Sequence, residues 1–355
     1  MMKIIFKKMM LFYVALTLVA TPVELLAAHK KSHKRIYTSQ KNVLSNQRNS
    51  SRFKASRLKV SLRSHAVRQL QIENQRQSIL GDRYDGSGIL QLASTKALII
   101  NQNSGEIVYA KNTNQLTPIA SITKLMTAMV MLDANQSLDD EIYVSDEDVD
   151  YLKGTRSRLT VGSGLSRSDM LQLALMSSEN RAASALAHNF PGGRLAFVKA
   201  MNFKAQELGL KNTHFVDPTG LDSENVSTAE DLAKMVKAAF QYPEIRLATT
   251  SPSHEVYLEG RKYPVNFVNT NGLVRAGEWQ IGLSKTGFIN EAGRCLVMQA
   301  TIAGEPMIIV LLDSNGKFTR IGDAKRIRKW IEYNNDAFPT TTGQSPNDIM
   351  AGSIS

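Results

Sequence analysis

Three short patterns place hydroxyl and amine side chains at spacings that suit acyl transfer. The first is Ser121-Ile-Thr-Lys124. Positions three apart lie on one face of a helix, so the Ser121 hydroxyl and the Lys124 amine can meet. A serine becomes a nucleophile when an adjacent base takes its proton, and a lysine can take it only if burial or a second cation lowers its pKa. We therefore expect Ser121 to be the nucleophile and Lys124 its base.

A serine three residues before a lysine is a weak signal by itself, because the same spacing occurs at 51–54 and 56–59. Those two copies lie in a polar stretch where nothing would keep water from the lysine. Ser121, in contrast, follows Pro118 and opens a predicted helix over 121–132 whose apolar positions cover much of its circumference. A central, buried helix can desolvate Lys124, which favours this copy over the other two.

The second pattern is Ser178-Glu-Asn180, between two predicted helices. A hydroxyl and an amide there can relay a proton and hold a substrate carbonyl, although both residues are also common helix caps. Ser223-Glu-Asn225 has the same spacing but lies in a predicted loop, so we prefer Ser178.

The third pattern, Lys285-Thr-Gly287, stands at the end of a predicted strand. Lys285 would supply the second cation, Thr286 would bind a substrate carboxylate, and Gly287 would let a substrate approach the backbone closely. Taken alone, this pattern would also fit a solvated strand end.

In this order and spacing the three patterns form the signature of penicillin-binding proteins and class A β-lactamases. Over about residues 90–333 the chain resembles the low-molecular-mass penicillin-binding proteins, a family of serine D-alanyl-D-alanine carboxypeptidases and endopeptidases. Segments 118–124, 176–183 and 214–222 add to the resemblance, and 177–183 is most similar to the endopeptidases. Glu179 departs from the Gly or Asp that the family usually has there.

The resemblance implies a catalytic cycle on peptidoglycan stem peptides. Ser121 would attack the carbonyl of a D-alanine while Lys124 accepts its proton. Ser178 and Lys285 would help to protonate the leaving amine. Water would then hydrolyse the acyl-enzyme, and β-lactam antibiotics would act as covalent inhibitors.

The resemblance also implies the residues that hold the substrate. Asn180 would orient the acyl side chain, and the backbone N–H groups of Ser121 and Phe288 would form the oxyanion hole. Arg320, ten residues before Trp330, would hold the carboxylate on the leaving side. Arg320 would equally fit the solvated end of a loop.

Several other functions compete with a DD-endopeptidase. A carboxypeptidase would usually carry a second domain and an anchoring helix after Trp330, and only 25 residues follow it. A β-lactamase would need a deacylating Glu in an E-x-x-L-N stretch, which the sequence lacks. A non-catalytic penicillin sensor or peptidoglycan-binding protein would not need all three motifs. Because the six histidines form no ligand cluster, we expect no metal or other cofactor.

The order of predicted elements indicates the fold class. A hairpin at 97–109 precedes the helix at 121–132 and further helices at 168–176, 181–189, 194–208 and 228–240. Strands at 279–288, 295–303 and 307–313 and a helix at 321–333 follow, with Cys295 expected as a core residue. This order predicts an α+β fold, an antiparallel sheet covered by N- and C-terminal helices with an inserted all-helical lobe (β-lactamase/transpeptidase-like).

The N-terminal region differs in composition from the rest. Lysines followed by an apolar run and Ala27-Ala28 predict a signal peptide over 1–28, cleaved near Ala28, which implies a periplasmic protein. The whole chain has a net charge of +11, whereas residues 29–80 alone have +12. Because the leader is also positive, the chain after residue 80 is slightly acidic. We expect 29–88 to be a largely disordered basic arm, which could contact an anionic envelope surface, and 334–355 to be a flexible tail. The sequence contains no nucleic-acid motif.

Overall fold

The computed structural model describes residues 90–337. A five-stranded antiparallel sheet with the order β2–β1–β11–β10–β9 brings the two ends of this region together. Its strands confirm the predicted hairpin and the three later strands: β1 (Lys96–Asn101), β2 (Ile107–Lys111), β9 (Gln280–Ile289), β10 (Gly293–Ile302) and β11 (Glu305–Ser314). Strand β9 is an edge strand, so one of its sides is open to other partners.

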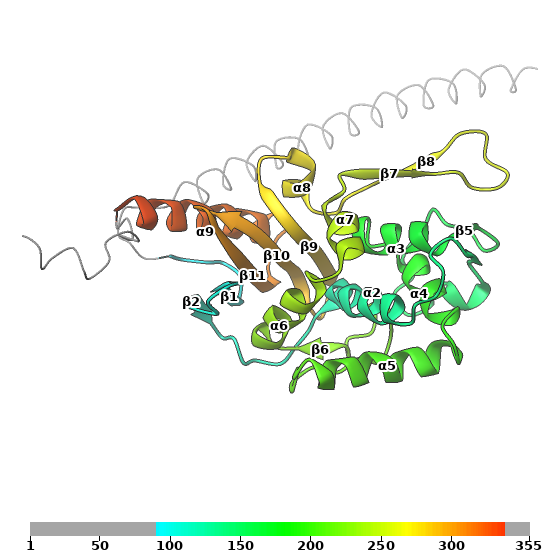
Figure 1. Cartoon of the computed structure of the whole chain (residues 1–355), viewed down its shortest axis with the longest axis horizontal. Helices are drawn as coiled ribbons and strands as arrows, with labels where there is room; N and C mark the ends of the chain where they lie inside the picture. The colour runs from blue at the N-terminus through cyan, green and yellow to red at the C-terminus, as the bar shows by residue number, and fades with distance from the viewer. Residues whose placement is uncertain (1–89, 338–355) are drawn as a thin grey trace, which may run out of the picture. The chain divides into compact units, whose positions relative to one another are not determined.

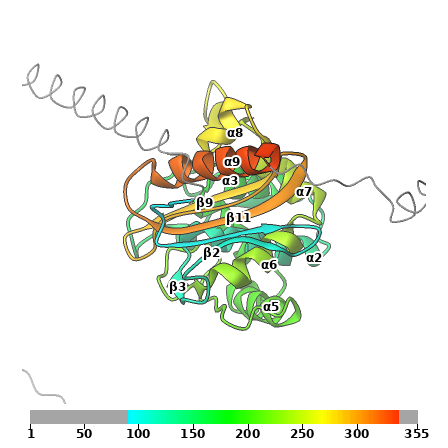
Figure 2. The ribbon, with the colours of Figure 1, turned by 90° about the vertical axis from the view of Figure 1, so that its left-hand side faces the viewer.

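Both faces of the sheet are covered, because side chains alternate along each strand and both sets are apolar. One cross-strand row consists of Ile99, Ile309 and Met298, and it belongs to a core cluster with α9 (Thr319–Ala337). The neighbouring row consists of Leu98, Val310 and Val297, and it belongs to the larger core shared with the helical lobe. Figure 2 shows α9 on one side of the sheet and α6 on the other. The C-terminal covering helix is thereby confirmed, whereas a covering helix before residue 90 would lie outside the described residues.

The chain between β2 and β9 forms the helical lobe, as predicted (Figure 1). Its central helix follows a 3₁₀ turn, η1 (Ala120–Thr123), and every residue of the helix from Lys124 to Met131 is buried. The helices of the lobe are α2 (Lys124–Asp133), α3 (Arg167–Met176), α4 (Asn180–His188), α5 (Gly193–Glu207), α6 (Ala229–Ala239) and α7 (Pro243–Thr250).

Short antiparallel strand pairs lie in the loops before, between and after these helices. Strand β3 (Thr117–Pro118) pairs with β6 (Val226–Ser227), and β4 (Glu141–Tyr143) pairs with β5 (Gly164–Ser166). A hairpin of β7 (Ser253–Val256) and β8 (Val265–Val268) leads into α8 (Gly272–Ala276), and a second 3₁₀ turn, η2, spans Asp146–Asp148. We did not predict these pairs, α7 or α8, because short and largely exposed elements carry almost no apolar periodicity.

Two predicted boundaries are wrong. The helix predicted over 228–240 is shorter by one residue at each end: Thr228 is the N-cap of α6, and its hydroxyl accepts from the Asp231 N–H. Helix α9 continues to Ala337, into the segment expected to be tail. The predicted signal peptide, the basic arm over 29–88 and the tail beyond 337 lie outside the described residues. Within 90–337, no helix has both the length and the apolar character that crossing a membrane requires.

Candidate active site

The Ser121–Lys124 contact is made on a 3₁₀ turn. Ser121 lies in η1 and Lys124 begins α2. A 3₁₀ turn has three residues per turn, so positions i and i+3 eclipse each other more closely than in an α-helix. The Lys124 Nζ is 3.0 Å from the Ser121 Oγ. The turn is fixed by the completely buried side chains of Ile119, Ala120 and Ile122.

Lys124 is buried, with 1% of its surface exposed, and two of its three hydrogen-bond partners can only accept from it. Its Nζ donates to Asn180 Oδ1 at 2.7 Å and to the Thr219 carbonyl oxygen at 2.6 Å. A neutral amine has two N–H donors and one lone pair. If those two acceptors take both N–H groups, the lone pair points to the remaining contact, the Ser121 hydroxyl. This arrangement can receive the serine proton.

Burial decides the charge of Lys124. Desolvation lowers the pKa of Lys124 to about 7, although the negative charges of Asp217, Glu179 and Asp150 oppose it. The pKa of Lys124 is therefore lowered as expected, but burial is the cause and no second cation contributes. At neutral pH a large fraction of Lys124 is deprotonated and available as a base.

A tight loop at 217–222 supplies the carbonyl that holds Lys124. Asp217 Oδ1 accepts from the N–H groups of Thr219 and Gly220 and from the Thr219 hydroxyl, and its Oδ2 accepts from the Asp222 N–H. Gly220 has φ +79°, and a Cβ there would lie 1.9 Å from the Ala120 carbonyl oxygen. The loop therefore packs directly against η1, which only a glycine at this position allows.

Sequence reasoning gave this loop no role. Residues 214–222 were recognised only as part of the family resemblance. The available signal was Asp217 two residues before Thr219, since an aspartate at that spacing forms a side-chain-to-backbone turn. Nothing local indicated that the carbonyl of the turn would meet a lysine 95 positions away.

Ser178 and Asn180 lie in the connection between α3 and α4. Ser178 has a left-handed backbone (φ +61°), and its Oγ accepts from the Lys285 Nζ at 2.8 Å. The Asn180 Nδ2 donates to the Thr155 Oγ1 at 3.0 Å, while its oxygen faces Lys124. The N-cap residue of α4 is Glu179, and it makes no side-chain cap bond. The alternative of ordinary helix capping is therefore wrong for both residues.

The third motif runs along the edge strand β9 beside the nucleophile. Lys285 is 1% exposed, so the alternative of a solvated strand end is wrong. Burial and the charges of Lys124 and Arg320 all hold the pKa of Lys285 well below its usual range. A Cβ at Gly287 would lie 3.1 Å from the Ser121 backbone nitrogen, so the strand passes close to η1. Thr286 donates to the Thr270 hydroxyl at 2.7 Å.

Arg320 is the second residue of α9 and only 9% exposed, so it is not a solvated loop end. Within residues 90–337, its buried Nε and Nη1 atoms have no hydrogen-bond partner. Burial and the neighbouring Arg294 lower the pKa of Arg320. Buried donors without partners cost free energy unless a ligand satisfies them. An anion in the adjacent cavity would do so.

The motifs meet at one cavity of about 470 Å³. Lys124 and Lys285 lie behind its wall, in contact with the two serines that face it. The Phe288 side chain is 50% exposed, and its ring lies 4.3 Å from the Arg294 guanidinium. The residues that line the cavity are Ser121, Lys153, Thr155, Ser178, Asn180, Leu221, Thr270, Thr286, Gly287, Phe288, Ile289, Asn290 and Arg320.

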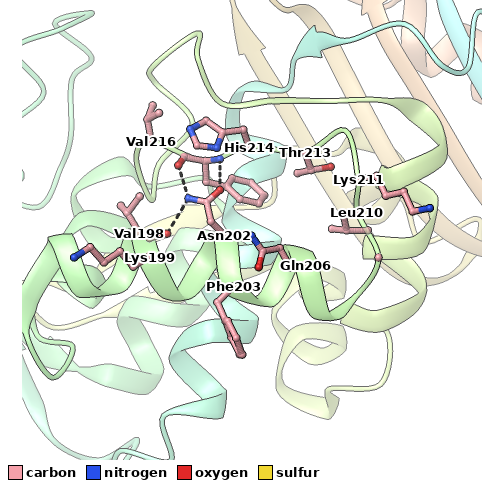
Figure 3. Close-up of a pocket in the computed structure, with 12 residues that line it drawn as sticks. Val198, Lys199, Asn202, Phe203, Gln206, Leu210, Lys211, Thr213, His214 and Val216 are labelled. Carbon is pink, nitrogen blue, oxygen red and sulfur yellow. Dashed lines mark hydrogen bonds between the residues drawn. The ribbon is translucent and has the colours of Figure 1, made fainter.

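A second cavity, of about 950 Å³, lies between α5 and residues 209–216 (Figure 3). None of the three motifs lines it. Asn202 is occupied there by structural bonds: its Nδ2 donates to the carbonyls of Val198 and Phe215, and its Oδ1 accepts from the Phe215 N–H. In spite of its size, the cavity is therefore not the site that the three motifs form.

The second S-x-N copy, His188 and Cys295 have structural surroundings. Asn225 of the second S-x-N pattern is completely buried and donates to Thr123 and the Asp217 carbonyl. His188 is the last residue of α4, and its Nδ1 contacts Asp148. Cys295 is buried in β10, as predicted, and burial raises its pKa to about 11. Within the described range, no three His, Cys, Asp or Glu side chains gather as a metal site would require.

Comparison with known proteins identifies the family. The model of the D-alanyl-D-alanine carboxypeptidase family matches residues 84–316. The chain belongs to this family. Family members include the D-alanyl-D-alanine endopeptidase of Pseudomonas aeruginosa, 51% identical over 68% of this chain and 78% of that protein. The D-alanyl-D-alanine endopeptidase of Escherichia coli is 49% identical over the same shares.

Solved structures show the same fold. The Streptomyces K15 DD-transpeptidase superposes with a TM-score of 0.63 at 29% identity, over 68% of this chain and 97% of that one. Penicillin-binding protein D2 of Listeria monocytogenes, solved in an ampicillin-bound form, superposes with a TM-score of 0.58 at 29% identity, over 68% of this chain and 98% of that one. The α+β, transpeptidase-like fold class is thereby confirmed.

Proposed function

We propose that this member of the family hydrolyses D-alanyl bonds of peptidoglycan through an acyl-enzyme on Ser121, chiefly as a DD-endopeptidase. One observation carries the proposal. A lysine whose pKa is about 7 lies 3.0 Å from the Ser121 hydroxyl, and a cavity opens in front of that hydroxyl. A positioned nucleophile with a base one hydrogen bond away meets the geometric requirement for covalent catalysis.

Acylation begins with proton transfer. The Ser121 hydroxyl gives its proton to the Lys124 lone pair, and its oxygen bonds to the carbonyl carbon of a D-alanine. The carbonyl oxygen becomes an oxyanion, which accepts from the backbone N–H groups of Ser121 and Phe288. Gly287 supports this pairing, because its Cα lies close enough to the Ser121 nitrogen that a Cβ would crowd it at 3.1 Å. Asn180 holds Lys124 with its oxygen and orients the acyl group from the same position.

Collapse of this intermediate releases the amine. Lys285 donates to Ser178 at 2.8 Å, so the two residues can pass a proton toward the leaving nitrogen. The C–N bond breaks, the amine leaves protonated, and the acyl group remains on Ser121. The proton that Lys124 took from Ser121 replaces, through solvent in the cavity, the proton that Lys285 and Ser178 gave to the amine, so Lys124 is neutral again. Water then attacks the ester and gives a proton to Lys124, which passes it to the Ser121 oxygen as the acyl group leaves and so restores the serine. The carboxylate of the leaving residue binds the free donors of Arg320, and the Thr286 hydroxyl turns from Thr270 to donate to it as well.

Relatives support the choice of bond. Two relatives that share about half of their aligned residues with this chain are named D-alanyl-D-alanine endopeptidases, whereas the family model is described as a carboxypeptidase. We therefore assign cleavage of cross-links as the main activity and removal of terminal D-alanine as the alternative. β-Lactams acylate Ser121 in the same way.

We also propose the cellular setting from the sequence. Lysines and an apolar run within residues 1–28 support export and cleavage near Ala28, which places the enzyme in the periplasm. Residues 29–88 form the basic arm before the catalytic domain, and their positive charge suits an anionic envelope surface. The catalytic domain then extends from residue 89 to the end of α9.

Digestion of purified muropeptides tests the proposal. Conversion of cross-linked dimers to monomers, followed by mass, identifies an endopeptidase, and conversion of pentapeptides to tetrapeptides identifies a carboxypeptidase. Ser121→Ala is the control for a contaminating hydrolase. Covalent labelling by fluorescent penicillin without turnover of any muropeptide would contradict the proposal and favour a penicillin sensor.

A further inference from the structure

An ion pair at the rim of the cavity joins the helical lobe to the sheet. The Lys153 Nζ lies 2.5 Å from Glu291 Oε1. Lys153 belongs to the segment between η2 and β5, and Glu291 to the turn between β9 and β10. Lys153 lines the cavity in front of Ser121, and so does Asn290, the neighbour of Glu291. Neither the three motifs nor the proposed catalytic cycle uses this pair.

The lysine side of the pair is held in place relative to the catalytic residues. Asp150 accepts from the N–H groups of Leu152 and Lys153 and from both the N–H and the hydroxyl of Thr155. The Thr155 hydroxyl oxygen in turn accepts from Asn180. Because Asn180 also bonds Lys124, a short chain of hydrogen bonds fixes where the Lys153 backbone stands with respect to the nucleophile.

The two charges themselves are exchangeable. Their side chains are 28% and 42% exposed, so water screens their attraction and the pair adds little net stability. A ligand that brings its own carboxylate to Lys153 and its own ammonium to Glu291 would replace one ion pair by two. A zwitterionic α-amino-acid head group, with both charges on one carbon, has this chemistry.

We propose that Lys153 and Glu291 form a subsite for a zwitterionic α-amino-acid head group. The head group is the end of the side chain of the residue that precedes the scissile D-alanine. The proposal rests on the proposed function, because it assumes that the D-alanyl carbonyl lies beside Ser121 and Gly287. The acyl peptide then follows the open edge of β9 toward its turn. Glu291 is four residues beyond Gly287, which is roughly 13 Å along a strand. The residue before D-alanine covers a similar distance if it has a straight side chain of about four bonds whose end makes one hydrogen bond to Glu291.

The subsite gives the enzyme a way to select the donor strand. A head group whose amine or carboxylate is already consumed by a cross-link or an amide would make one contact instead of two. The pair therefore favours donors that carry the free zwitterion. Ser121 and the oxyanion donors act on the D-alanine carbonyl and do not contact the zwitterionic head group.

Three thioester donors that differ only in the residue before D-alanine test the subsite. The residue is diaminopimelate with a free head group, lysine with an ammonium alone, or Nε-acetyl-lysine with neither charge. Release of thiol reports kcat/KM independently of the leaving amine. We expect diaminopimelate to exceed acetyl-lysine by about tenfold, with lysine between them.

The variants separate a binding role from a structural one. In Lys153→Met and Glu291→Gln, we expect the preference for diaminopimelate over acetyl-lysine to fall to about threefold, and to about one in the double variant. Fluorescent penicillin carries no such head group, so its acylation rate should stay within about twofold of wild type. Lys199→Met removes an exposed lysine of the cavity in Figure 3 and should leave the preference unchanged.

Each failure has its own signature. Equal rates of wild type on all three donors would overturn the subsite and leave the DD-peptidase intact. An unchanged preference in the double variant would likewise overturn it. No thiol release from any donor would instead contradict the proposed function.

Discussion

Lys124 and Lys285 are two lysines of one cleft with the same burial and opposite surroundings. Each is 1% exposed, each contacts a serine that lines the cavity, and burial lowers the pKa of both. The charges around Lys124 are acidic and oppose the fall of its pKa, whereas the charges of Lys124 and Arg320 lower the pKa of Lys285 further. Burial therefore makes both amines reactive, and the neighbours decide at which pH each one is charged.

The difference suits two roles. A base for Ser121 should titrate near neutral pH, because it must accept a proton and later release it. Lys285 has two cations beside it, so a substrate carboxylate near Arg320 would favour its protonated form and make it a donor at the moment the amine must leave. We had expected Lys285 to act on Lys124 as a second cation. The structure gives burial as the main cause for Lys124.

The largest effect should come from removing the base. Lys124→Met keeps the length of the side chain and removes the amine, so we expect the rate of acylation by fluorescent penicillin to fall by about a thousandfold. Lys124→Arg should not restore it, because an arginine stays charged. Acylation by the arginine variant within about tenfold of wild type would show that Lys124 acts by its charge and not as a base. Thermal unfolding of both variants checks that they fold.

The next effect concerns the loop that serves Lys124 alone. Gly220→Ala would place a methyl group 1.9 Å from the Ala120 carbonyl oxygen, and we expect a loss of about 3 kcal/mol or more in the free energy of unfolding. Gly209→Ala is the matched control, since its φ is +65° and its Cβ would meet open space. It should cost about 1 kcal/mol. Denaturant unfolding measures both, and equal losses would mean that the close packing of the loop on η1 is not what requires glycine.

A smaller effect is expected on the Lys285 side. Arg320→Leu removes the proposed carboxylate partner and a charge that lowers the pKa of Lys285. We expect about a thirtyfold loss of kcat/KM on a peptide that ends in a free carboxylate, or ~2 kcal/mol. An ester donor whose leaving group has no carboxylate should lose much less. Equal losses on the two substrates would remove this role from Arg320.

The smallest effect is a shift of the pH profile. Acylation should rise with pH through about 7, where Lys124 loses its proton, and level off above that. The negative charge of Glu179 raises the pKa of Lys124, so Glu179→Gln should move the profile to lower pH by less than about one unit. Measured acylation rates from pH 5 to 10 give both profiles. A flat wild-type profile would contradict a titrating base, and a shift to higher pH would contradict the assigned influence of Glu179.

Much of the fold was readable from local pattern. The buried strands of the sheet and the long helices have strong apolar periodicity, so their existence and order were predicted. The hairpin β7–β8, the short helices and the Thr228 cap were missed or misplaced, because single residues decide them. The alternative roles considered for Lys285 and Arg320 failed for one reason: exposure depends on what packs on a residue, which its own neighbours in sequence do not specify.

By itself the sequence determined which chemical groups this protein has and in what order. Ser121, Lys124, Ser178, Asn180 and Lys285 were chosen from residue type, spacing and family resemblance. Only the tertiary structure decided their electrostatics. The Thr219 carbonyl, the neighbouring charges and the orphaned donors of Arg320 come from segments far apart in the chain. Desolvation and charge coupling act through space over a few ångströms, so no reading of local sequence can supply them.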